Sequence, residues 1–137
     1  MKADRIPAKK VSKNGYLNYW KKARELEAMM QESILKNNWN AAALNALHAA
    51  MLANDSLLIH FHGVKSTSRK HNDAVRLLTS LMKSDEANKN ARHLRKLINE
   101  KSTVEYTGKL LSPARSKELC KHAQRFIAWA NSLLPRK

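Results

Sequence analysis

Residues 41 to 63 read AAALNALHAAMLANDSLLIHFHG, and this stretch decides the fold class because it is apolar around most of a helical circumference. A helix with apolar residues on nearly all sides is normally central and covered by its neighbours. Asn38 can cap its start, and Gly63 is the residue type that best tolerates the left-handed conformation after a helix. We therefore predict a buried helix from Trp39 to His62.

Further helices are predicted on both sides of this one, from apolar residues that recur at spacings of three, four and seven. They run from Tyr16 to the KNN at 36–38, from just after Ser68 to Met82, from Ser84 or Asp85 to Ile98, and from Pro113 to Leu134, with a connector at 102–108. Only three Gly and three Pro are present, which leaves few turns for a sheet of many strands. The sequence predicts an all-α bundle of about five helices in one domain over residues 15–137, preceded by a flexible basic arm over residues 1–14.

The net charge is strongly positive. The chain has 137 residues with 26 Lys and Arg against 11 Asp and Glu, a formal charge of +15. Residues 1–24 carry +7, residues 25–64 carry −3 and residues 65–137 carry +11. A charge of this size exceeds what solubility requires and points to a polyanionic partner, most often nucleic acid. A generally basic surface with no such partner is the alternative.

Cysteine usage and hydropathy restrict the class of protein. The single Cys120 cannot form an intramolecular disulfide, and no Cys/His cluster has the spacing of zinc ligands. There is neither a secretory apolar segment nor a run of about 18 uncharged apolar residues. We expect a cytoplasmic protein without metal, cofactor or membrane partner.

The segment GVKSTSRKH at 63–71 is the candidate phosphate site. It places cations beside three consecutive hydroxyls, and the next helix is expected to begin there with unpaired N–H groups and a positive dipole end. The candidate residues are Lys65, Ser66, Thr67, Ser68, Arg69, Lys70 and His71. The alternative is that one hydroxyl caps the helix and the cations are solvated.

Two other groups of polar residues bear on function. Basic faces of the last two predicted helices form a candidate nucleic-acid surface, comprising Arg92, Arg95, Lys96, Lys121 and Arg125. His48, Asp55 and His62 form a narrow stripe on the central helix. Residues seven apart lie about 10 Å apart along a helix, too far to share one metal ion, so the stripe is expected to face solvent or a symmetry mate.

Catalytic signals are weak in this sequence. No nucleophile elbow, phosphate-binding loop or dinucleotide fingerprint occurs. A lone cysteine on a helix, such as Cys120, is usually a small core residue.

Four segments, in this order, resemble the small stand-alone members of the HEPN superfamily. They are LLIHFHG at 57–63, VKSTSRKHNDAVRLL at 64–78, LRKLINEKSTVEYTG at 94–108 and AQRFIAWANSLL at 123–134, and the resemblance covers about residues 16–134. It implies an up-and-down bundle that dimerises, a nucleotide or RNA ligand, and a role beside a nucleotidyltransferase or in defence and toxin–antitoxin systems.

Ribonucleases of that superfamily carry Arg, four to six residues and then His just ahead of their last helices. The corresponding stretch here, NEKSTVEY at 99–106, has neither residue, whereas Arg115 and His122 show this spacing inside the last predicted helix. The leading hypothesis is a homodimer that binds RNA, DNA or a nucleotide, with RNA preferred, and does not cleave it. The alternatives are a metal-independent ribonuclease using Arg115 and His122, and a partner subunit of a nucleotidyltransferase.

Overall fold

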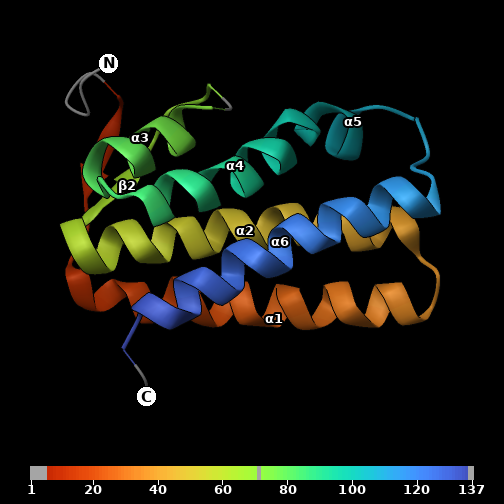
Figure 1. Ribbon diagram of the computed structural model, residues 1–137, viewed down its shortest axis with the longest axis horizontal. Coiled ribbons are helices and arrows are strands. Elements are labelled where there is room, and N and C mark those ends of the chain that lie inside the picture. Colours follow the sequence, from red (N-terminus) through yellow and green to blue (C-terminus); the bar gives the residue numbers. More distant parts are fainter. Residues whose placement is uncertain (1–5, 71, 136–137) are drawn as a thin grey trace.

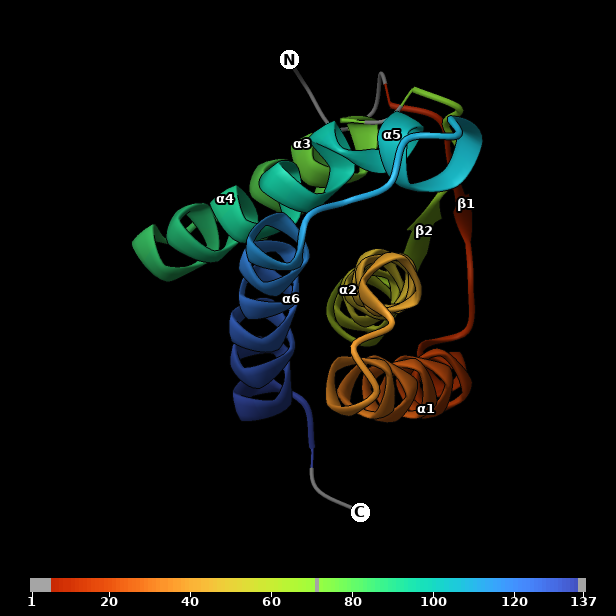
Figure 2. The same ribbon diagram turned by 90° about the vertical axis from the view of Figure 1, so that its right-hand side faces the viewer.

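The computed structural model describes residues 6–70 and 72–135, and its centre is helix α2 (Trp39–His62), as the sequence predicts. Twelve residues of α2 are buried. Figure 2 looks along this helix and shows α1 (Tyr16–Leu35) and α6 (Pro113–Leu133) on two of its sides. α2 has the length and hydropathy of a membrane span, and most of it is buried inside the bundle, as is usual for a core helix.

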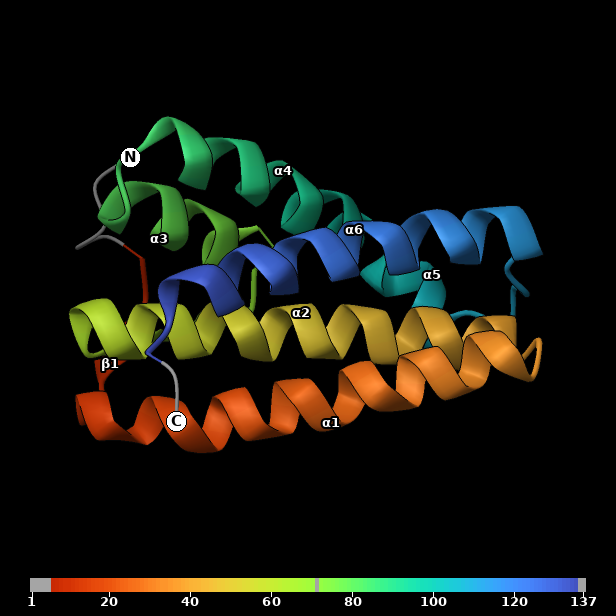
Figure 3. The same cartoon turned by 60° about the horizontal axis from the view of Figure 1, so that its bottom comes forward.

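The four long helices alternate in direction, which makes the fold an up-and-down helical bundle (Figure 1). α1 and α2 form a hairpin, and Asn37 in its turn has a φ of 59°, a left-handed conformation that Asn tolerates better than most residues. α6 crosses α2 and packs along α4 (Asp85–Asn99), as Figure 3 also shows. Small residues on α2, among them Ala43, Ala46 and Ala50, are fully buried and allow this close packing.

The starts of α4 and α6 are set by side-chain caps, which confirms two predicted boundaries. The Ser84 hydroxyl accepts a hydrogen bond from the Ala87 N–H at 3.0 Å. The Ser112 hydroxyl accepts one from the Arg115 N–H at 3.1 Å, with Pro113 at the first helical position. Each cap satisfies an N–H group that the helix itself leaves unpaired.

Three short helical segments complete the described helices: the 3-10 helix η2 (Lys13–Gly15), α3 (Asp73–Leu81) and α5 (Lys101–Tyr106). α5 occupies most of the segment that the sequence assigned to a helix end and connector. α3 begins at Asp73, five residues later than the hydroxyls at which a helix start was predicted, and this correction matters for the candidate phosphate site.

A small antiparallel sheet is the main feature that the sequence analysis missed. Strand β1 (Ala8–Lys10) pairs with β2 (Val64–Ser66), with Lys9 opposite Lys65. Ile6, just before β1, is 4% exposed. The prediction of a flexible arm over residues 1–14 is therefore wrong for residues 8–10, which backbone hydrogen bonds attach to β2; residues 1–5 lie outside the described part.

Gly63 joins α2 to this sheet and has a φ of 64°, the left-handed conformation predicted for it. A Cβ at this position would lie 3.3 Å from the Val11 carbonyl oxygen. The Val11 N–H donates to the Gly63 carbonyl at 2.8 Å. Glycine is therefore favoured here both by conformation and by the close approach of the N-terminal segment.

Candidate functional site

A basic groove lies between α4 and α6. Its volume is about 800 Å³, and both helices contribute to its walls. Four cationic side chains line it, against the single acid Glu86: Lys89, Arg92, Lys96 and Arg125. All four are exposed, and none has an ion-pair partner within the described part of the chain. The groove therefore presents uncompensated positive charge on two rigid helices.

Two histidines face each other across this groove. The Nδ1 atoms of His93 on α4 and His122 on α6 are 2.9 Å apart, and the ring centroids are 5.2 Å apart. One Nδ1–H must donate to the other nitrogen, so at least one of the rings is neutral. Burial is the main cause that lowers the pKa of both imidazoles; neighbouring cations lower it further, and at His122 the carboxylate of Glu118 opposes the decrease. Protonation of the pair is opposed by the same cations that make the groove basic.

The predicted nucleic-acid surface is brought together only in part. Arg92, Lys96 and Arg125 line the groove, whereas Arg95 and Lys121 are exposed on the same helices outside it. The sequence analysis missed the groove positions of His93 and Trp129. Helical spacing could have indicated these positions. Residues 89, 92, 93 and 96 share one face of α4, and residues 122, 125 and 129 share one face of α6.

Arg115 is not brought to His122. Its guanidinium pairs with Glu100 at 3.1 Å and also bonds Glu118, and the Glu100 contact is the main cause that raises its pKa above the usual value. Arg115 thus connects the start of α6 to the end of α4. Within one chain these two residues do not form a common site, and about two helical turns of α6 separate them.

The candidate phosphate residues lie around a second, separate cavity of about 390 Å³. Lys65, Ser66, Ser68, Arg69 and Lys70 line it, together with residues of α2, α3 and α5. Thr67 does not line the cavity, and its backbone N–H donates to the Pro7 carbonyl. His71 lies outside the described residues.

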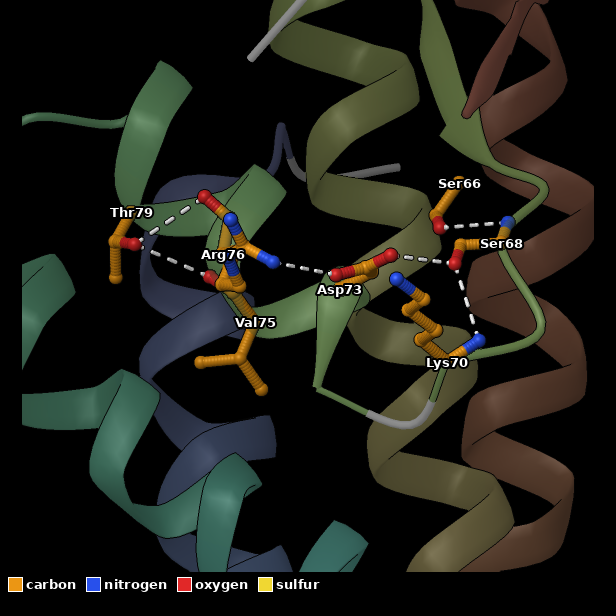
Figure 4. A network of polar contacts seen from close by, with 7 residues as sticks. All are labelled: Ser66, Ser68, Lys70, Asp73, Val75, Arg76 and Thr79. Carbon is orange, nitrogen blue, oxygen red and sulfur yellow. Dashed lines mark hydrogen bonds and ion pairs between the residues drawn. The ribbon is translucent and has the colours of Figure 1, made fainter. Parts of the chain in front are cut away.

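The hydroxyls of this segment hold a loop rather than the start of a helix (Figure 4). Ser68 Oγ donates to Asp73 Oδ2 at 2.6 Å and accepts from the Lys70 N–H at 3.1 Å. The Arg76 guanidinium donates to the other oxygen of Asp73 at 3.0 Å. Ser and Asp compete in this way with helix formation. The predicted convergence of Ser66, Thr67 and Ser68 on a helix N-terminus is therefore wrong, because α3 starts at Asp73.

The polar stripe of α2 contacts other elements of the same chain, instead of facing only solvent or a symmetry mate. His48 Nε2 lies 2.7 Å from Glu105 Oε2 on α5. Asp55 Oδ2 lies 4.0 Å from Lys65 Nζ on β2, and burial raises the pKa of Asp55 to about 6 against the opposing effect of Lys65. His62 is exposed. Two members of the stripe thus attach α5 and β2 to the central helix.

Neither cysteine-based catalysis nor a metal site is supported by the described residues. Burial raises the pKa of Cys120 to about 11, so its nucleophilic thiolate form is scarce near neutral pH. Among residues 6–70 and 72–135, no three His, Cys, Asp or Glu side chains form a group that could hold a metal ion.

Comparison with protein-family models and with curated proteins found no match to this chain.

Proposed function

We propose that the protein binds nucleic acid, with RNA preferred to DNA, in the groove between α4 and α6. The observation that carries the proposal is the set of four unpaired cations, Lys89, Arg92, Lys96 and Arg125, along one groove. Each cation that neutralises a phosphate releases condensed counterions, and this release supplies most of the affinity for a nucleic-acid backbone.

A single strand suits the groove better than a duplex. Trp129 lines the groove and is half-buried, so part of the indole is available to a base. Base stacking on an aromatic ring contributes about 1–3 kcal/mol and requires an unstacked base. The groove also lies between two helices, an arrangement that suits a flexible strand better than it suits insertion into a DNA groove.

A salt titration tests this proposal. The affinity of a fluorescently labelled 20-nucleotide single-stranded RNA is measured by anisotropy from 50 to 300 mM NaCl, for the wild type and for Arg92→Ala/Lys96→Ala. We expect a log–log slope of roughly −3 for the wild type, since about 0.7 counterion is released per neutralised phosphate. The variant should have a slope about one unit shallower. A wild-type slope near zero would contradict the proposal.

The second candidate function is metal-independent RNA cleavage, and the His93–His122 pair is the observation that favours it. Two imidazoles near a bound ribose phosphate can act as general base and general acid near neutral pH. This active site would replace the Arg115 and His122 pair of the ribonuclease alternative. Labelled RNA incubated in EDTA decides: cleavage that is lost in both His93→Ala and His122→Ala supports an enzyme, and intact RNA supports binding alone.

The same proposal includes membership of the HEPN superfamily and a cytoplasmic homodimer. It also includes either a nucleotidyltransferase partner or a role in a toxin–antitoxin system. Their support is the resemblance in sequence, together with the alternating direction of four long helices. Sedimentation at about 100 μM tests the dimer directly, and a monomer at that concentration would count against it.

A further inference from the structure

The cavity beside α5 brings together four parts of the chain that are distant in sequence. α2, the segment from β2 into α3, α3 itself and α5 all contribute to its lining. Its volume of about 390 Å³ lies within the range of sites for small molecules, which begins near 300 Å³. It shares no lining residue with the α4/α6 groove, so the two sites can be altered separately.

The cavity carries more positive than negative charge. Lys101 is neutralised by Glu105, with Nζ 2.6 Å from Oε1. Lys65 Nζ lies 4.0 Å from Asp55 Oδ2 and donates a long hydrogen bond, of 3.5 Å, to the Ser66 carbonyl. The side chains of Arg69 and Lys70 have no ion pair or hydrogen bond within the described part of the chain, and both line the cavity. An anionic group placed between them would compensate this charge.

Ser66 supplies a hydroxyl donor at the same place. Its Oγ accepts a hydrogen bond from the Ser68 N–H at 3.3 Å, and its own proton has no acceptor among the described residues. The Ser68 hydroxyl, in contrast, already donates to Asp73. Ser66 is therefore the hydroxyl available to a ligand. The Ser68 hydroxyl accepts from the Lys70 N–H and so shapes the loop that carries Lys70 (Figure 4).

Tyr106 adds an aromatic ring to the same lining. It is 70% exposed, and Lys101 Nζ lies 5.2 Å from its ring centroid and 3.3 Å from its hydroxyl. Met51 and Ala74 contribute apolar surface to the same cavity. An exposed aromatic ring in the same lining as the uncompensated Arg69 and Lys70 fits a ligand that carries both a phosphate and a planar ring.

We propose that this cavity binds a nucleotide phosphate monoester, with its phosphate against Arg69, Lys70 and Ser66 and its base on Tyr106. The monoester carries close to two negative charges at neutral pH, which the two unpaired cations match. The inference goes beyond RNA binding in the groove and does not rest on it.

Isothermal titration of the full chain at pH 8 tests the inference with three probes: adenosine 5′-monophosphate, inorganic phosphate and adenosine. We expect the nucleotide to bind most tightly, phosphate to bind more weakly, and adenosine to bind weakest of all. Arg69→Ala/Lys70→Ala should weaken nucleotide binding at least about tenfold, since it removes two cations that can donate charge-assisted hydrogen bonds to the phosphate. Equal affinity for the nucleotide and for adenosine would overturn the inference, as would an unchanged affinity in the double variant.

Three further variants separate the two parts of the ligand and the effect of net charge. Tyr106→Ala should weaken nucleotide binding and leave phosphate binding unchanged. Asp55→Asn should strengthen nucleotide binding a few-fold, because it removes a negative charge from the lining. Arg95→Ala/Lys121→Ala removes two charges outside the cavity and should have little effect. A wild type that binds RNA but not the nucleotide overturns this inference alone, and one that binds the nucleotide but not RNA overturns only the proposed function.

Discussion

The α4/α6 groove and the cavity beside α5 each have four cations in their lining, but these cations are held in different ways. In the groove they project from two long helices and have no acidic partners within the described residues. In the cavity, two of them lie near carboxylates, and the loop carrying the other two is attached to Asp73 through Ser68. A polyanion bound mainly through its backbone charge suits the first arrangement, and a compact ligand of fixed shape suits the second.

Charge reversal should give the largest difference between the two regions. Arg92→Glu/Lys96→Glu should weaken binding of a single-stranded RNA at least about 100-fold at 50 mM salt, because attraction becomes repulsion within the groove. Arg69→Glu/Lys70→Glu should weaken it less than about tenfold. The RNA carries hydroxyls at both ends, so that no terminal monoester can occupy the cavity. Equal losses in the two variants would mean that the two regions form one surface.

Loss of the loop attachment should affect stability. Asp73→Ala should lower the free energy of unfolding by about 2–3 kcal/mol, because the buried carboxylate bonds both Ser68 and Arg76. Ser68→Ala should cost about 1 kcal/mol. Thr67→Ala is the control at the neighbouring exposed position and should change stability by less than about 0.5 kcal/mol. Urea unfolding measures all three, and a neutral Asp73→Ala would show that the network does not hold the loop.

Asp55 should make stability depend on pH. Its pKa is about 6 in the folded protein against 3.8 ordinarily, so the folded state binds the proton more tightly than the unfolded chain does. The stability contribution is therefore complete below pH 4 and falls as the pH rises through 6, by at most about 3 kcal/mol. Asp55→Asn should remove this loss of stability at high pH. The substitution should therefore stabilise the protein more at pH 8 than at pH 5. Parallel stability curves for the two proteins would contradict this role of burial.

The smallest predicted effect is the pH dependence of RNA binding. His93 and His122 have lowered pKa values in the free protein, and a bound polyanion favours their protonated forms. Affinity should therefore rise a few-fold as the pH falls below the ordinary value of 6.5, and it should be flat above it. His93→Gln/His122→Gln should bind with little pH dependence. Anisotropy measurements between pH 5.5 and 8 test this prediction. If the RNA affinity of the variant also rises at low pH, the titrating group lies elsewhere.

The long helices could be predicted because their signals are local. The apolar circumference of α2, the glycine after it and the capping hydroxyls of α4 and α6 act within a few residues of each boundary. The sheet could not be predicted in this way. β1 and β2 are only three residues long and pair across more than 50 residues of sequence, so neither has a recognisable alternating pattern.

The candidate sites also combine features that are local in the sequence with features that depend on how distant segments pack. The basic faces of α4 and α6 are visible in the sequence, but the meeting of His93 with His122 depends on how the helices pack. Lys65, Ser66, Ser68, Arg69 and Lys70 of the predicted phosphate segment line one cavity, but the helix start predicted at this segment is wrong, because α3 begins at Asp73. Ser68 bonds Asp73 and Lys70 instead of capping a helix, a choice between two local hydrogen-bond patterns that the residue types leave open.

The most direct test of the groove compares two double variants that each remove two positive charges from the pair of helices α4 and α6. Arg92→Ala/Lys96→Ala removes two cations from the groove, and Arg95→Ala/Lys121→Ala removes two exposed cations outside it. Both proteins keep an equal net charge, so a difference in single-stranded RNA affinity reports position alone. We predict at least a tenfold larger loss for the groove variant at about 100 mM salt, where each lost phosphate contact costs on the order of 1 kcal/mol. Equal losses would contradict the account, because the charge would then act over the whole surface and not in the groove.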